Sequence, residues 1–284
     1  TGTGSPTVIL APGLGGTTLS WAGTQRRLSA LTEVIAYDRA GFGFSDPGPL
    51  PRTADAIHSD LRAMIKALDL RPPYILAGHS AGSYDVRMYA SRYPDEVAGL
   101  VLVDPSSEEQ TERFRVASED FDKLNVMAAA MYRRCGEAAA AGKLKRDNPE
   151  YADCFALGYP DLSEPLTNAY KNMRLAPGLW QAWESEMASF GSESVPQMRA
   201  VRRPLGDIPL IVLTAKNIQM GPVKLPDDMD TKLRTIWFAL HADLASLSTK
   251  GDRRMIESGH NIQVEHPQLV ADAIAEVVQM ARAT

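Results

Sequence analysis

The sequence predicts an α/β fold, with a doubly wound, mostly parallel sheet and an inserted helical cap. Apolar runs without polar interruption, such as Thr7–Ala11 and 99–103, are typical of parallel strands buried on both faces. Segments of helical length separate these runs, which indicates βαβ units. From 106 to 204 the alternation stops and only helical patterns occur. We therefore expect residues 1–105 and 205–284 to form the α/β core and residues 106–204 to form the cap, or lid.

The first two predicted strands each end in a loop rich in glycine. Thr7–Ala11 is followed by Pro12-Gly13-Leu14-Gly15-Gly16, which can bring backbone amides close to a ligand. The strand at 34–37 is followed by Asp38-Arg39-Ala40-Gly41-Phe42-Gly43-Phe44-Ser45. A helix is then expected from Thr53, because apolar residues repeat along one face at Ile57, Leu61, Ile65 and Leu68.

The third predicted strand leads into the most informative motif of the chain. Tyr74-Ile75-Leu76-Ala77 runs directly into Gly78-His79-Ser80-Ala81-Gly82, and a helical pattern follows at 83–93. A strand, a sharp turn and a helix form the context in which Gly-x-Ser-x-Gly acts as a nucleophile elbow, with the serine hydroxyl exposed at the end of a sheet. A turn with an incidental serine would not need that context. We therefore predict that Ser80 is a nucleophile.

The remaining elements follow the same alternation. Further strands are expected at 99–103, 208–214 and 254–257, and helices at 231–247 and 267–283. The last strand ends in Ser258-Gly259-His260, so His260 follows a strand at the sheet edge where Ser80 must lie.

A serine hydroxyl needs a base within hydrogen-bond reach and a third group that orients this base. His260 is the predicted base; a structural role in its loop is the alternative. The other histidines are placed less well. His58 and His241 fall in predicted helices, the His79 side chain should point away from that of Ser80, and His266 precedes Pro267 at a helix start.

The acid should lie between Ser80 and His260 in the chain and near the end of a strand. The loop after 208–214 contains no carboxylate, whereas Asp104 directly follows the strand after the elbow. Asp104 is therefore the predicted acid. The alternatives that remain open are the aspartates of the later loop and a weakly orienting amide: Asp227, Asp228, Asp230 and Asn217.

Attack on a carbonyl creates an oxyanion, which backbone amides can stabilise. One predicted donor is the N–H of Ala81, directly after the nucleophile, and the other is the N–H of Leu14 in the first glycine loop. The alternative for that loop is a simple strand-ending turn.

Composition narrows the function classes. The chain has 284 residues, a formal net charge of −5 and a mean hydropathy of −0.20. This charge provides no basic field for nucleic acid, and no apolar run reaches the length of a membrane span. No cofactor or metal is expected, and the oligomeric state is not predicted. Because the chain starts at Thr1 without a methionine or hydrophobic leader, we expect an upstream segment to be missing.

The two cysteines, Cys135 and Cys154, lie in the same central segment. Their spacing matches no zinc motif, since no histidine lies near them. We predict a disulfide, with two separate buried thiols as the alternative. A disulfide would favour a secreted or periplasmic protein.

Together these motifs resemble the α/β-hydrolase superfamily, in particular its serine esterases and lipases with a helical cap. The resemblance covers nearly all of the chain except the cap and is carried by Pro12-Gly13-Leu14-Gly15, the segment 38–45, the Gly78–Gly82 elbow and Gly259-His260. It implies an eight-stranded sheet, whose first two strands would precede Thr1. Proline replaces the usual histidine of the oxyanion loop, and the usual aspartate after 208–214 is missing. Some family branches place the acid where Asp104 stands.

The expected function is hydrolysis of small-molecule carboxylic esters through an acyl-enzyme. The same triad could serve an aminopeptidase or amidase, or a lactonase. Glu184 or Glu186 would be the candidate carboxylates for recognising a peptide N-terminus, and the polar face of a helix explains the two residues equally well. A serine nucleophile disfavours epoxide hydrolase and dehalogenase chemistry, which needs a carboxylate. The alternative outside enzymes is a ligand receptor with this fold.

Overall fold

The computed structural model describes residues 1–117, 121–156, 162–217 and 227–283. Within these residues six strands form one parallel sheet in the order β2-β1-β3-β4-β5-β6. The resemblance implied eight strands, two of them ahead of Thr1, and the described part of the chain forms six. Their bounds are β1 Thr7–Ala11, β2 Val34–Ala36, β3 Tyr74–His79, β4 Val97–Val103, β5 Leu210–Ala215 and β6 Gly251–Ile256.

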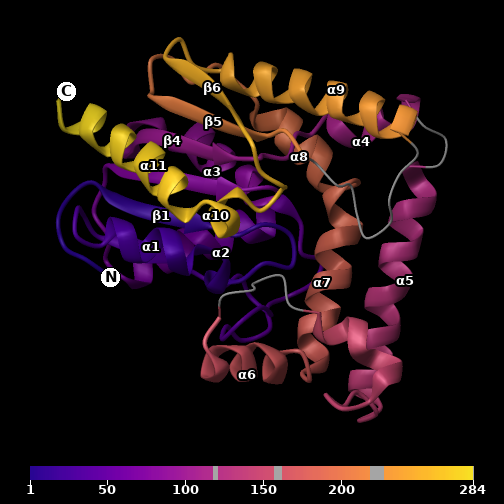
Figure 1. Ribbon diagram of the computed structural model, residues 1–284. Coiled ribbons are helices and arrows are strands. Elements are labelled where there is room, and N and C mark those ends of the chain that lie inside the picture. The colour runs from indigo at the N-terminus through magenta and orange to yellow at the C-terminus, as the bar shows by residue number, and fades with distance from the viewer. Residues whose placement is uncertain (118–120, 157–161, 218–226, 284) are drawn as a thin grey trace.

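Helices cover both faces of the sheet, as a doubly wound fold requires (Figure 1). Alternate residues of β1 point to opposite faces: Val8 and Leu10 join one apolar cluster, and Ile9 joins the other. Helices α1 (Ala22–Leu28) and α11 (Pro267–Arg282) pack on the first face. Helices α2 (Ala54–Ala67), α3 (Gly82–Arg92) and α9 (Asp227–Ala245) pack on the second face.

The predicted and observed elements differ where apolar runs are short. Strand β6 begins at Gly251, earlier than predicted. Its first residues were missed because Asp252 and Arg253 are polar and lie exposed on the edge strand of the sheet. Helix α1 was not predicted, since its sequence Ala-Gly-Thr-Gln-Arg-Arg-Leu lacks an apolar repeat. The short elements η1 (Thr18–Trp21), η2 (Pro94–Glu96) and α10 (Ile262–Glu265) were also not predicted.

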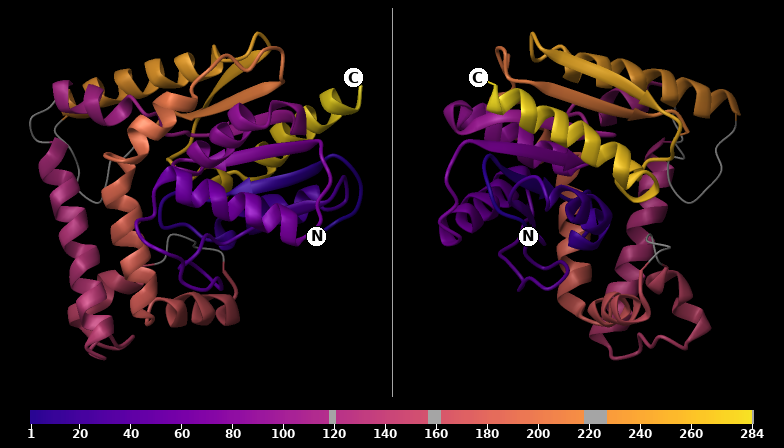
Figure 2. Two further views of the ribbon diagram at one scale, coloured as in Figure 1. Left: turned by 180° about the vertical axis from the view of Figure 1, so that it is seen from behind. Right: turned by 60° about the vertical axis from the view of Figure 1, so that its left-hand side comes forward.

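A helical insertion separates β4 from β5, within the range 106–204 predicted as a cap. Two of its helices, α5 and α7, lie side by side and extend beyond the sheet, with α6 near their far end (Figures 1 and 2). The Cys135–Cys154 disulfide is present and joins α5 to η3 inside the apolar core of the insertion. The elements are α4 Gln110–Ala117, α5 Phe121–Ala140, η3 Pro149–Phe155, α6 Glu164–Met173, α7 Pro177–Phe190 and α8 Ser194–Val201.

Both ends of the insertion are tied to the core by one buried carboxylate. Glu108, just after β4, accepts hydrogen bonds from Arg87 of α3 at 2.7 and 2.8 Å and from Arg202, just after α8, at 2.6 Å. Burial works to raise the pKa of Glu108, but the two guanidinium groups outweigh it and lower that pKa to about 2. In the part of the chain that the structure describes, no helix is long and apolar enough to cross a membrane.

Candidate active site

Ser80 lies at the sharp turn between β3 and α3. Its φ of +50° is in the left-handed region, which side-chain-bearing residues rarely adopt. The two flanking glycines permit this turn. A Cβ on Gly78 would lie 2.5 Å from the Gly82 carbonyl oxygen, and a Cβ on Gly82 would lie 2.5 Å from the Ala11 carbonyl oxygen. A side chain at position 78 would therefore clash with the backbone of Gly82, and a side chain at position 82 would clash with the end of β1.

Asp104 and His260 meet at the carboxyl end of the sheet. His260 Nδ1 lies 2.6 Å from Asp104 Oδ2, and the Asp104 side chain is completely buried. Asp104 Oδ1 accepts hydrogen bonds from the Ala215 amide at 2.9 Å and from Trp237 Nε1 at 3.0 Å. Since the carboxylate can only accept, His260 Nδ1 carries a proton, and in the neutral ring the lone pair is therefore on Nε2. This is the tautomer that a general base requires.

Asp104 stays ionised because its partners compensate for burial. Burial works to raise the pKa of Asp104, but the hydrogen bonds from His260 and Trp237 outweigh it and hold that pKa below its ordinary value. His241, on α9, lies behind the carboxylate and donates from Nε2 to the Pro105 carbonyl oxygen at 2.8 Å. Burial lowers the pKa of His241 to about 4, so this ring is neutral near pH 7.

The other candidate acids lie elsewhere. Asp227, Asp228 and Asp230 form the first turn of α9, where the first two are exposed and Asp230 pairs with Arg234. Acidic residues at a helix N-terminus interact favourably with the helix dipole. Asn217 is exposed, and residues 218–226 of the same loop lie outside the described residues. The structure brings only Asp104, of these candidates, to His260.

Two residues that sequence reasoning missed hold the loop of His260. Glu265 accepts hydrogen bonds from the Gly259 amide at 2.8 Å and from Ser258 Oγ at 2.9 Å. His79 donates from Nε2 to the His260 carbonyl oxygen at 3.0 Å, and the two imidazole centroids lie 4.7 Å apart. Burial lowers the pKa of His79 to about 3, so its ring is neutral. Its position within the elbow motif was the one available signal for this contact.

The remaining site groups surround Ser80. Gly13 packs so closely that a Cβ there would lie 2.8 Å from His79 Nδ1 and 3.1 Å from Ser80 Cβ. Among the described residues, the amides of Leu14 and Ala81 donate to no protein acceptor, and Ser80 Oγ makes no hydrogen bond to His260. Two free amides beside an elbow serine are suited to an oxyanion.

A buried arginine supports the glycine loop from behind. The Arg39 side chain is 1% exposed and donates to the Pro12 and Gly13 carbonyl oxygens at 2.5 and 2.6 Å. Glu186 of α7 pairs with the same guanidinium at 2.7 Å. Glu186 is therefore used inside the protein as the partner of Arg39. Glu184, two residues earlier, pairs with Arg133 at the surface. Neither carboxylate has the free, site-facing position that recognition of a peptide N-terminus would need.

A second carboxylate lies near the same guanidinium. Asp85 Oδ2 is 3.9 Å from Arg39 and 3.3 Å from the Tyr37 hydroxyl, which donates to it. Burial, with repulsion from Glu186, raises the pKa of Asp85 to about 7 even though Arg39 opposes the shift. The cluster therefore holds one cation and two carboxylates that share it.

Aromatic side chains of the insertion cover the glycine loop. A Cβ on Gly15 would lie 2.2 Å from the Trp183 indole, so only glycine fits beneath that ring. Trp183 stacks on Tyr132 of α5 with centroids 4.5 Å apart and on Trp180 at 5.6 Å. The guanidinium of Arg174 lies 5.0 Å from the Trp183 ring. The insertion thus places an aromatic surface directly over the loop that contains Leu14.

Other polar clusters have structural roles. His58 is buried against Tyr93, and His266 is exposed at the start of α11. Cys135, Asp153 and Cys154 form the one group of potential metal ligands in the described ranges, but both sulfurs belong to the disulfide. A disulfide sulfur cannot act as a thiolate ligand.

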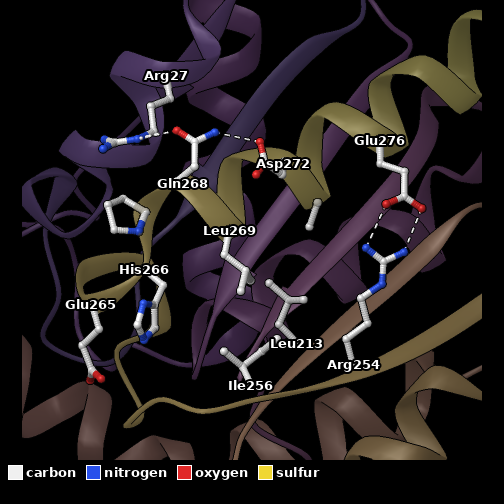
Figure 3. A pocket seen from close by; sticks show the side chains of 12 residues that line it. Arg27, Leu213, Arg254, Ile256, Glu265, His266, Gln268, Leu269, Asp272 and Glu276 are labelled. Atoms are coloured by element: carbon white, nitrogen blue, oxygen red, sulfur yellow. Dashed lines mark hydrogen bonds and ion pairs between the residues drawn. The ribbon is translucent and has the colours of Figure 1, made fainter.

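A cavity of about 600 Å³ lies away from the triad, between α11, α10 and the last two strands (Figure 3). The polar groups of its lining already have partners: Arg254 pairs with Glu276, Gln268 links Arg27 to Asp272, and Glu265 accepts from Ser258 and Gly259. Those pairs leave no converging free groups, so the cavity does not compete with the triad as a reactive site.

Comparisons with known proteins agree with this architecture. Residues 6–174 match the family described as alpha/beta hydrolase fold. An AB hydrolase superfamily protein of Gibberella zeae is 32% identical over 98% of this chain and 87% of its own. The human (lyso)-N-acylphosphatidylethanolamine lipase is 25% identical over 79% of this chain and 72% of its own. A thermophilic esterase from Thermogutta terrifontis shares the fold, with a TM-score of 0.58 and 23% identity over 99% of this chain and 92% of its own. The chain therefore belongs to the α/β-hydrolase family.

Proposed function

We propose that the protein is a serine hydrolase that cleaves carboxylic esters through an acyl-enzyme intermediate. Ser80 is the nucleophile, His260 the general base and Asp104 the orienting acid. The observation that carries this proposal is the 2.6 Å contact between His260 Nδ1 and the buried Asp104 carboxylate, beside an elbow serine at φ +50°. A base oriented by a buried carboxylate, at the same sheet edge as an elbow serine, is the arrangement that nucleophilic acyl transfer needs.

Acylation follows from this arrangement. Ser80 Oγ attacks the ester carbonyl carbon as His260 Nε2 takes its proton, a contact that has to form when substrate binds. The Leu14 and Ala81 amides donate to the oxyanion of the tetrahedral intermediate. The bond from carbon to the alcohol oxygen then breaks, and the imidazolium returns its proton to the leaving alkoxide.

Deacylation repeats the same steps with water as the nucleophile. His260 takes a proton from water, and the hydroxide attacks the acyl carbon. The imidazolium then protonates Ser80 Oγ as the carboxylic acid leaves. Asp104 remains ionised throughout and stabilises the imidazolium.

Esters are the favoured substrate class for two reasons. The similar proteins include a lipase and an esterase. They also include a protein described as an epoxide hydrolase, a chemistry that needs a carboxylate nucleophile, and a deformylase that shares the fold at 16% identity. The candidate carboxylates for a peptidase, Glu184 and Glu186, are both ion-paired. An amidase, a lactonase or a ligand receptor with this fold is supported by no separate observation. The insertion, which covers the glycine loop with Trp183, is proposed to act as the lid.

The test combines labelling with turnover. A fluorophosphonate should label folded wild-type protein but not Ser80→Ala, because only the activated hydroxyl reacts. Ser80→Ala should also lose roughly 10⁶ in kcat on p-nitrophenyl esters, as in other serine hydrolases. Ser83→Ala, which removes a hydroxyl bonded to the Ser106 carbonyl, should still be labelled. Absence of labelling in the wild type, or faster cleavage of an aminoacyl-arylamide than of any ester, would reject the proposal.

We also propose that the protein functions outside the reducing cytosol, because the Cys135–Cys154 disulfide would persist there. Fractionation of the producing cells should find the protein in the periplasm or medium. A purely cytosolic protein would refute this location.

A further inference from the structure

Arg39 and Glu186 connect the insertion to the loop that carries the Leu14 amide. Arg39 comes from the loop after β2 and Glu186 from α7, so the pair joins the core to the insertion. Both side chains are almost completely buried, at 1% and 4% exposed. Removing one partner of an ion pair this deep is costly because, among the described residues, the Arg39 guanidinium would then keep only Asp85, at 3.9 Å, and Glu186 would lose its ion pair.

The hydrogen bonds of Arg39 fall on the peptide units that form the glycine loop. One guanidinium nitrogen donates to the Pro12 carbonyl and the other to the Gly13 carbonyl. The Gly13 carbonyl and the Leu14 N–H belong to the same peptide group. Donation to the carbonyl oxygen polarises that group and makes its N–H a stronger donor, since hydrogen bonds in a chain reinforce one another. The same bonds also fix the direction of the N–H.

Helix α7 reaches this position through several close contacts with the core. A Cβ on Gly41 would lie 2.6 Å from the Ala182 methyl group, and Ser185 Oγ accepts a hydrogen bond from the Arg52 amide at 2.9 Å. Trp183 covers Gly15 on the same side. Glu186 is therefore delivered to Arg39 only when α7 is docked on the glycine loop.

We propose that Arg39 is a positioning residue for the oxyanion hole and that Glu186, supplied by the insertion, holds its guanidinium on the Pro12 and Gly13 carbonyls. The proposal rests on the proposed serine hydrolase function and names a residue pair that couples the insertion to it. Undocking of α7 would remove the counter-ion and loosen the Leu14 amide. The insertion would then control the rate of the chemical step in addition to access.

The closing experiment compares four variants on p-nitrophenyl acetate, with active sites counted from the burst of p-nitrophenol. Arg39→Met should lower kcat by about 10² per active site with KM changed less than about threefold, because a transition-state donor is misplaced. Arg39→Lys should recover part of this loss. Glu186→Gln should lower kcat about tenfold, whereas Glu184→Gln, two residues earlier and exposed, should be unchanged.

Affinity for a boronic acid, which forms a tetrahedral adduct on Ser80, should fall in parallel with kcat. If Arg39→Met proves unstable, Glu186→Gln and Arg39→Lys carry the test. A wild-type kcat per active site in Arg39→Met, or in both Glu186→Gln and Arg39→Lys, would overturn the inference, even if the melting temperature falls. Labelling of Ser80 in these variants would leave the proposed function standing. A wild type that neither labels nor turns over esters would overturn both.

Discussion

The two halves of the site are held in different ways. The acid half, Asp104 with His260, is held by the sheet and α9 through the Ala215 amide and Trp237. The insertion touches this half from outside: Phe114 of α4 stacks on Trp237 with centroids 6.1 Å apart, and Arg202, just after α8, donates to Asp243 of α9 at 2.8 Å. The proposed oxyanion half is held by Arg39, whose counter-ion Glu186 belongs to the insertion. In the proposed mechanism the core therefore organises proton transfer, and the core and the insertion share the binding of the oxyanion.

This difference suggests how the fold can change specificity while it keeps its chemistry. The acid half can remain assembled while the insertion changes. The oxyanion half responds to the insertion through one ion pair and one indole ring. Each prediction below perturbs one half and asks whether the other follows.

The largest expected effect is in the acid half. Asp104→Asn should lower kcat by about 10⁴, because the amide favours the wrong imidazole tautomer. KM should change little, since Asp104 is completely buried behind His260. Steady-state kinetics on p-nitrophenyl esters would measure both values.

Asp230→Asn is the control for that variant, because Asp230 pairs with Arg234 at the start of α9. It should keep wild-type turnover. The reverse pattern, with Asp104→Asn active and Asp230→Asn inactive, would transfer the acid role to α9.

The next largest effect is expected at the junction of insertion and core. Glu108→Gln leaves the Arg87 guanidinium, 4% exposed, without its charge partner, which should cost about 3 kcal/mol of unfolding free energy at pH 7. In the wild type the pKa of Glu108 is lowered to about 2 on folding, so its contribution is complete above pH 4.5 and is lost as the pH falls towards 2. The difference between the two proteins should therefore shrink to about 1 kcal/mol at pH 2.5.

Urea unfolding at several pH values would measure this difference. Glu109→Gln is the control, because its partner Arg199 is 44% exposed and such pairs contribute less than about 1 kcal/mol. A constant difference between wild type and Glu108→Gln from pH 7 to 2.5 would contradict the assignment.

A smaller stability effect is expected inside the insertion. Replacing Cys135 and Cys154 by serine opens a loop with a sequence separation of 19, which should cost about 3 kcal/mol or less. Amide exchange should accelerate in α5 and η3, and the Asp104–His260 half should keep its protection. Equal acceleration of amide exchange at β4 and β5 would show that the insertion and the Asp104–His260 half do not open independently. Mass spectrometry without reductant should show the two cysteines linked in the wild type.

The sequence predicts the acid half better than the oxyanion half for a physical reason. Ser80 and Asp104 directly follow β3 and β4, and His260 lies in the loop just after β6, so the strand order brings all three positions to one edge of the sheet. Glu186 lies 147 positions after Arg39 in a helix whose docking no periodicity encodes. Its burial was not predictable, and the sequence reasoning treated it as a possible exposed carboxylate. The length of strand β6 was underestimated because its first residues are exposed and polar at the sheet edge, so they carry no apolar pattern.

The smallest effect is expected at His79, which touches both halves: it donates to the His260 carbonyl and packs against Gly13. His79→Phe keeps a ring but loses the donor, so kcat should fall about tenfold, the value of one net hydrogen bond. His79→Gln keeps a donor and should lose less. Because burial lowers the pKa of His79 to about 3, neither variant should move the pH–rate profile between pH 5 and 8. A shifted profile would mean that His79 titrates with His260. A loss as large as that of Asp104→Asn would mean that one ring joins the two halves into a single unit.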